Sequence, residues 1–144
     1  MLYVLMVLAV LAGTVSVVAQ RWSDQVARAK ELQLLRVGDA IAKALAAYQA
    51  STPGVDKRFP PRLEDLVLDL RFGNPRHHLR ELYPDPMTGR PDWQLLRDSR
   101  GGIVGVRSSS DRPTWRRVPQ RMDFVDLPAA TRVSQWVFTP RMFP

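Results

Sequence analysis

Residues 1–20 read MLYVLMVLAVLAGTVSVVAQ and contain no charged side chain. A helix rises about 1.5 Å per residue, so this stretch would extend about 30 Å, the thickness of the hydrocarbon core of a bilayer. The competing interpretation is a cleavable signal peptide, because Val17-Val18-Ala19 resembles a small-residue cleavage site. No basic region precedes the run, which also exceeds the usual apolar length of about 7–15 residues. The pattern therefore favours a transmembrane anchor over residues 1–20.

The charges around this predicted anchor bear on its orientation. The first basic residues that follow it are Arg21, Arg28, Lys30 and Arg36. The positive-inside rule alone would place the C-terminal part in the cytoplasm, which conflicts with export. A short basic leader upstream of Met1, lost by processing or by a misassigned start, would reverse that inference.

Residues 21–50 are expected to continue the same helix out of the membrane, because they contain no proline, one glycine and many strong helix formers. An apolar stripe recurs at steps of three and four, and we expect it to pack on a sheet: Leu34, Val37, Ile41, Leu45 and Tyr48. The helix should end at Ser51-Thr52-Pro53-Gly54. Two separate helices are the alternative, but no turn signal divides them. We therefore predict one helix of about 50 residues, whose amphipathic part covers residues 21–52.

Residues 53–92 are predicted to form short helices and turns. After Pro60-Pro61, apolar residues with helical spacing indicate one short helix: Leu63, Leu66, Val67 and Leu70. A second helical piece is expected over residues 75–83, with Leu79 and Leu82 facing inward. His77 and His78 lie there; adjacent histidines make a poor metal pair, so we interpret them as exposed polar residues.

Residues 93–144 are predicted to form an antiparallel β-sheet with loops. Residues 93–97 and 103–108 are short apolar-rich runs joined by a glycine-containing loop of hairpin length. A third strand is expected over residues 133–139, with alternate side chains on opposite faces, and residues 122–125 are a candidate fourth. The segment 108–120 is expected to be a loop. The predicted fold class is α+β, with a long N-terminal helix packed on a small antiparallel sheet.

The composition argues against most kinds of chemistry. The net charge is +7 and the pI is near 10.7, yet the arginines are scattered through turns and tail, which disfavours a nucleic-acid partner. The chain has no cysteine, no HExxH motif and no Walker loop. The serine run 108–110 is typical of a loop, and Asp85 and Asp92 lack the further oxygen ligands of a calcium site. We therefore expect no enzymatic activity, cofactor, metal or small-molecule substrate.

A family resemblance rests on several short segments of the sequence. Residues 3–11 and Phe59-Pro60-Pro61 contribute, and the most particular match lies in Tyr83, Pro84, Asp85, Pro86, Met87, Thr88, Gly89 and Trp93, followed by Gly101, Gly102 and Gly105. The chain resembles type IV pilins and, more closely, a divergent group of type II secretion pseudopilins related to the major one. Two features depart from that family. Its glutamate near the mature N-terminus is replaced here by Val4 or Leu5, and its calcium-binding C-terminal loop is not recognisable.

The resemblance implies a structural subunit in the bacterial inner membrane, with a single span and a C-terminal domain in the periplasm. Its implied partners are other pseudopilins and an inner-membrane assembly platform. The residues implied in anchoring and assembly are Tyr3, Val4, Leu5, Gly13, Thr14 and Ser16. The missing carboxylate predicts a minor or specialised subunit. The alternative function is that of a membrane-tethered envelope protein whose basic domain binds polyanions.

Overall fold

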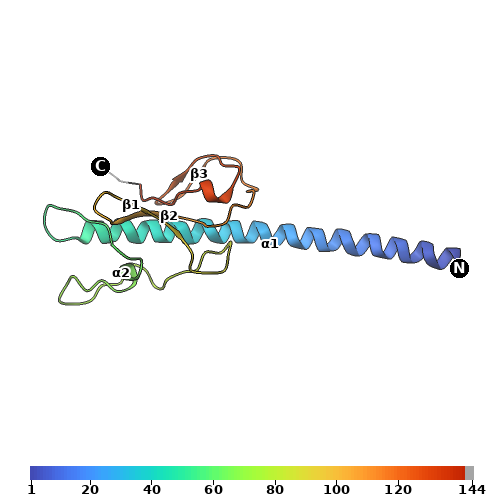
Figure 1. Cartoon of the computed structure of the whole chain (residues 1–144), viewed down its shortest axis with the longest axis horizontal. Coiled ribbons are helices and arrows are strands. Elements are labelled where there is room, and N and C mark those ends of the chain that lie inside the picture. Colours follow the sequence, from blue (N-terminus) through green and yellow to red (C-terminus); the bar gives the residue numbers. More distant parts are fainter. Residues whose placement is uncertain (142–144) are drawn as a thin grey trace.

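One long helix, α1 (Leu2–Ser51), organises the computed structural model, and a small domain packs around its C-terminal half (Figure 1). The structure describes residues 1–141, with side chains described for 1–11 and 20–141. The helix ends at Ser51, where the Thr52 hydroxyl donates to the Tyr48 carbonyl oxygen at 3.2 Å. Proline follows at position 53 and prevents continuation. The prediction of a single helix is confirmed.

Within residues 1–141, the strands form two small antiparallel sheets. Strands β1 (Gln94–Arg97) and β2 (Ile103–Arg107) pair with Gln94 opposite Arg107. Strands β3 (Gln120–Arg121) and β4 (Asp126–Leu127) form the second sheet. The α+β class, the long N-terminal helix and the hairpin over residues 93–108 are confirmed, but the sheet is divided into two pairs of strands.

The predicted third strand over residues 133–139 is largely wrong. This segment begins with a single turn of 3-10 helix, η1 (Val133–Gln135), and only Phe138 pairs with the sheet, through a bridge to Val106. The Gln135 side chain accepts a hydrogen bond from the Arg132 amide at 3.2 Å, which closes the turn. Because residues three apart share a face in such a turn, Val133 and Trp136 are both fully buried and the expected alternation is lost.

Residues 75–83 do not form the predicted second short helix. The amides of His78 and Leu79 both donate to the Leu66 carbonyl oxygen, at 2.9 Å and 2.8 Å, so this stretch is held by tertiary rather than local hydrogen bonds. Leu79 is buried as expected, but Leu82 is 40% exposed. The short helix α2 (Glu64–Val67) is present, and it ends too early to include Leu70.

The candidate fourth strand at residues 122–125 is a turn instead. The Met122 amide donates to the Val125 carbonyl oxygen at 2.9 Å, and this bond connects β3 to β4. The Phe124 amide donates to Asp39 of α1 at 2.9 Å, so the turn is also attached to the long helix.

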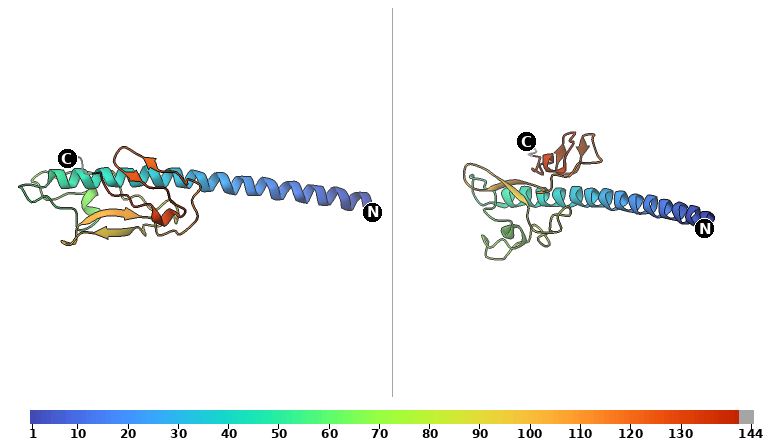
Figure 2. Two further views of the ribbon diagram at one scale, coloured as in Figure 1. Left: turned by 90° about the horizontal axis from the view of Figure 1, so that it is seen from above. Right: turned by 45° about the vertical axis from the view of Figure 1, so that its right-hand side comes forward.

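The core lies between the C-terminal half of α1 and strand β2, with η1 and α2 covering its edges. The five residues of the apolar stripe are all buried there: Leu34, Val37, Ile41, Leu45 and Tyr48. Two further views show the same arrangement: the domain lies beside the C-terminal half of α1, and the N-terminal half projects away from the domain (Figure 2).

Candidate functional site

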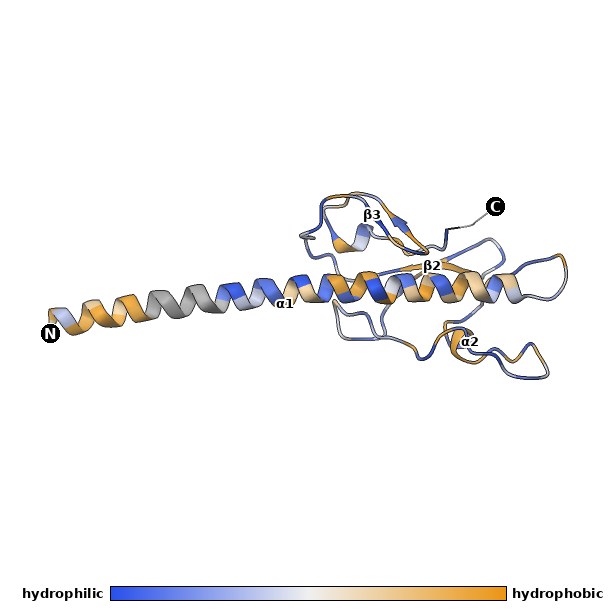
Figure 3. Cartoon of the chain, turned by 180° about the vertical axis from the view of Figure 1, so that it is seen from behind, coloured by the Kyte–Doolittle hydropathy of each residue, from blue (hydrophilic) through white to orange (hydrophobic). Residues whose placement is uncertain are grey.

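The most unusual surface of the molecule is the projecting half of α1. Its large apolar side chains from Met1 to Leu11 are exposed, including Tyr3 (79%), Val4 (59%) and Leu5 (64%). Colouring by hydropathy shows an apolar tip and, after the part drawn in grey, a hydrophilic section before the domain (Figure 3). Isolated apolar residues on a surface are normal, whereas a continuous apolar patch marks a site of interaction with protein or lipid.

The predicted anchor is described only in part. Gly13, Thr14 and Ser16 lie outside the residues whose side chains the structure describes. Among the residues for which side chains are described, no helix has both the length and the apolar character that a membrane crossing needs.

The turn that carries the family resemblance is built around Asp85, a fully buried carboxylate. It accepts hydrogen bonds from the Ser108 hydroxyl at 2.6 Å and from the Met87 amide at 2.9 Å. Its own backbone carbonyl accepts from the Gly89 amide at 2.7 Å, with Gly89 at a φ of 73° that favours glycine. Asp85 therefore fixes residues 83–93 against the end of β2, and this role is structural.

Asp92 closes the same turn from its other side. Its two oxygens accept from the hydroxyls of Thr88, at 2.5 Å, and of Ser109, at 2.9 Å. The Thr88 hydrogen bond lowers the pKa of Asp92, since it stabilises the charged form. Trp93 extends the attachment, because its indole nitrogen donates to the Tyr83 carbonyl oxygen at 2.8 Å. Within the described residues, no group of three or more His, Cys, Asp or Glu could hold a metal ion.

Two glycines of the resemblance lie where the chain approaches another segment closely. A Cβ at Gly105 would stand 2.5 Å from the Thr139 hydroxyl oxygen, and one at Gly102 would stand 2.9 Å from the Phe59 Cβ. Gly101 instead supplies a φ of 81° in the hairpin loop. These glycines allow β2 to lie between the C-terminal segment and the chain that follows α1.

A second buried carboxylate, Asp69, lies near the C-terminal end of α1. Arg71 donates to it at 2.6 Å and 2.8 Å, and also donates to the Tyr48 carbonyl oxygen at 3.1 Å. These hydrogen bonds hold the pKa of Asp69 well below its usual range. A guanidinium at the C-terminal end of a helix also complements the helix dipole, so this network caps α1.

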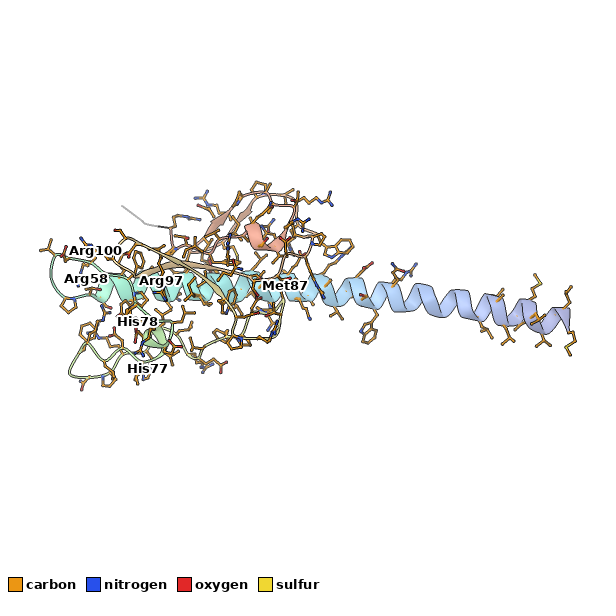
Figure 4. The ribbon with its side chains drawn as sticks, viewed as in Figure 1. Arg58, His77, His78, Met87, Arg97 and Arg100 are labelled. Carbon is orange, nitrogen blue, oxygen red and sulfur yellow. The ribbon has the colours of Figure 1, made fainter. Side chains whose placement is uncertain are left out.

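His78 was misjudged from the sequence, because it is a member of this network. Its Nε2 lies 3.0 Å from a carboxylate oxygen of Asp69, its ring meets Tyr48 edge-on, and its side chain is only 9% exposed. His77 is exposed as expected. Figure 4 shows both histidines on the loop beside α2. A sequence shows no signal for this pairing, since Asp69 and His78 meet only through the bridge between Asp69 and Arg76.

A third buried carboxylate, Glu31, was also missed. It is 1% exposed, and it accepts hydrogen bonds from the Trp115 amide at 2.9 Å and the Thr114 hydroxyl at 3.2 Å. Beside it, the Arg28 guanidinium lies 4.9 Å from the centre of the Trp115 ring. The only hint in the sequence was a carboxylate one turn before the apolar stripe.

Comparison of the chain with protein-family models, with curated proteins and with solved structures gave no match.

Proposed function

We propose that this chain is a non-enzymatic structural subunit of the pseudopilin class, serving a type II secretion or related pilus-like assembly. Two features support the proposal. One is the resemblance of the turn and hairpin motifs, and the other is the α+β architecture built on one long N-terminal helix. In this function α1 both anchors the subunit and packs the fibre, and the domain supplies the outer surface.

One observation carries the proposal: a single uninterrupted helix buries its C-terminal half in its own domain and leaves its large apolar side chains from Met1 to Leu11 exposed. At about 25 cal/mol for each Å² of apolar surface, water is a poor environment for such a segment. Lipid before assembly and neighbouring helices after assembly are two environments that cover it. A subunit that passes from lipid into a fibre needs a helix of which one part packs on its own domain and the other part is exposed and apolar.

The resulting mechanism is mechanical. The subunit waits in a bacterial inner membrane with its domain in the periplasm, and an assembly platform extracts it into a short helical fibre beside other pseudopilins. Val4 or Leu5, depending on the register, stands where the family places a glutamate, so this position lacks the acid that would neutralise a neighbour's terminal amine. This difference favours a minor or specialised position over repeated use along the fibre.

The test uses the full chain in a bacterium that carries a type II secretion system. We expect the protein to stay with membranes after alkaline carbonate washing. We also expect a photocrosslinker at Leu5 to capture other pseudopilins. The matched control is a crosslinker at Val55, which is fully exposed in the loop that follows α1. Release by carbonate, or capture that is equal from both positions, would contradict the proposal.

A membrane-tethered protein that binds polyanions is the second candidate, favoured by four arginines and no acidic residue in the segment 112–121. Strong salt dependence of DNA affinity would distinguish it, since phosphate contacts release counterions. An affinity for DNA that is weak at physiological salt would contradict this second function.

A further inference from the structure

The segment 112–121 is attached to α1 at the edge of the domain that faces the N-terminus. Glu31 is the attachment point, since its two carboxylate oxygens receive the Thr114 hydroxyl and the Trp115 amide. Because Glu31 is buried and already accepts these two hydrogen bonds, it fixes the height of the segment along the helix. These two hydrogen bonds hold Trp115, and with it the neighbouring Arg116, beside α1.

A hollow of about 330 Å³ opens at this edge, lined by Arg28, Glu31, Trp115 and Arg116. Arg28 lies over the Trp115 ring, and Trp115 remains 50% exposed. The single carboxylate in the lining is engaged by its two donors, so the groups left to meet a ligand are two guanidiniums and an indole. Guanidiniums bind phosphate oxygens through paired hydrogen bonds, and indoles favour the boundary between lipid and water.

The position along α1 identifies the ligand. Arg28 follows Gln20 by eight residues, a rise of about 12 Å. The headgroup layer extends about 5–8 Å beyond each side of the hydrocarbon core. Helical side chains lean toward the N-terminus, and long arginine side chains reach toward the interface. The Arg28 side chain can therefore cover the distance between its own backbone and the headgroup layer. Trp22, which is 71% exposed, lies on α1 between Gln20 and Arg28, at the height where interfacial tryptophans are common.

We infer that the hollow formed by Arg28, Trp115 and Arg116 binds the phosphate of an anionic phospholipid in the leaflet beneath the domain. This inference rests on the proposed anchoring of α1 in a membrane. Such a contact sets the height and the rotation of the domain above the bilayer while the subunit waits for extraction. It also gives a function to Arg28 and Arg116, the two arginines that line the hollow.

The test reconstitutes the full chain into vesicles of phosphatidylcholine alone or of phosphatidylcholine with phosphatidylglycerol. A spin label on the lipid headgroup quenches nearby tryptophans, and the difference between the unaltered chain and Trp115→Phe isolates Trp115. We expect stronger quenching of Trp115 in the anionic vesicles. Each arginine near an anionic surface shifts such an equilibrium about fivefold, so Arg28→Gln and Arg116→Gln should each remove much of the difference.

The control variants are Arg58→Gln and Arg100→Gln. These arginines lie at the end of the domain farthest from the N-terminus (Figure 4), where both face the exposed Asp56. They remove the same charge and should leave Trp115 quenching unchanged. Thermal melting of every variant checks that the domain remains folded, and the single change at Arg28 disturbs the domain least because Arg28 is exposed, whereas Arg116 is half-buried.

The outcomes separate this inference from the function on which it rests. Chain that floats with both kinds of vesicle, but whose Trp115 is quenched equally in both, overturns the lipid site and leaves the anchor intact. Chain that floats with neither kind overturns both. Equal effects from Arg116→Gln and Arg100→Gln show a general charge effect and also overturn the site.

Discussion

The ring of Phe138 occupies the space that a side chain at Gly38 would need: a Cβ there would stand 2.2 Å from Cδ1 of the ring. Phe138 is fully buried and pairs through its backbone with Val106 of β2. The only glycine of α1 beyond the apolar segment thus lies where the C-terminal segment crosses the helix. The close approach of these two elements explains a residue that is otherwise unfavourable inside a helix.

Gly38→Ala tests this relationship. Alanine favours helix by about 1 kcal/mol, but overpacking a core costs about 1–3 kcal/mol, so we expect a net loss of stability. Thermal or urea unfolding measures it. Gly73→Ala is the control, since a Cβ there meets nothing within 4 Å. A variant at Gly38 that is more stable than the unaltered protein would show that Phe138 moves aside freely.

Ile41→Asp should unfold the domain. Ile41 is 2% exposed at the centre of the helix stripe, and an unpaired charge there costs several kcal/mol. Val26→Asp introduces the same group at a 43% exposed site on the same helix and should change the melting temperature little. An unchanged melting temperature for the Ile41 variant would mean that the stripe serves another surface.

Asp85→Ala should destabilise the domain by about 3 kcal/mol, because it leaves the Ser108 hydroxyl and the Met87 amide without their acceptor. Asp85→Asn retains one carbonyl oxygen for Met87 and should cost less. Urea unfolding of both, with the exposed Asp123→Ala as the control, gives the order of effects. Equal losses for alanine and asparagine would show that only the charge matters.

Asp69 should make the stability of the folded domain depend on pH. The hydrogen bonds from Arg71 lower its pKa in the folded chain below the unfolded value of about 3.9. Its contribution is therefore fully present above about pH 5 and is lost as the pH falls through the unfolded pKa toward the folded one. Melting temperatures across this range should fall less for Asp69→Asn than for the unaltered chain. Asp56→Asn, at an exposed carboxylate, should retain the full dependence.

Val4→Glu or Leu5→Glu should increase incorporation along a fibre if the proposed function is correct. A carboxylate near the start of α1 could neutralise the terminal amine of the neighbouring subunit, which is costly to leave unpaired in an apolar setting. Crosslinking of purified pseudopili measures the share of this subunit, with Val4→Gln as an uncharged control. Long homopolymers of the unaltered chain would contradict its assignment as a minor subunit.

Local patterns were sufficient for the elements that depend on neighbouring residues. The absence of proline before position 53 and the repeated spacing of apolar residues determined α1 and its buried stripe. A glycine-containing loop between two apolar runs likewise determined the β1–β2 hairpin. Helix periodicity and turn chemistry act over a few residues, so the sequence contains their signals directly.

Tertiary structure alone decided the buried polar contacts, because the residues that form them are far apart in the chain. Glu31 meets Trp115, Asp85 meets Ser108, and residues 75–83 exchange a local helix for hydrogen bonds to Leu66. Each involves a buried polar group, whose cost is offset only when the fold supplies a particular partner. Side-chain periodicity records which face is apolar, but it does not record which distant group will satisfy a carboxylate, and this is why the three buried acids were found only in the folded chain.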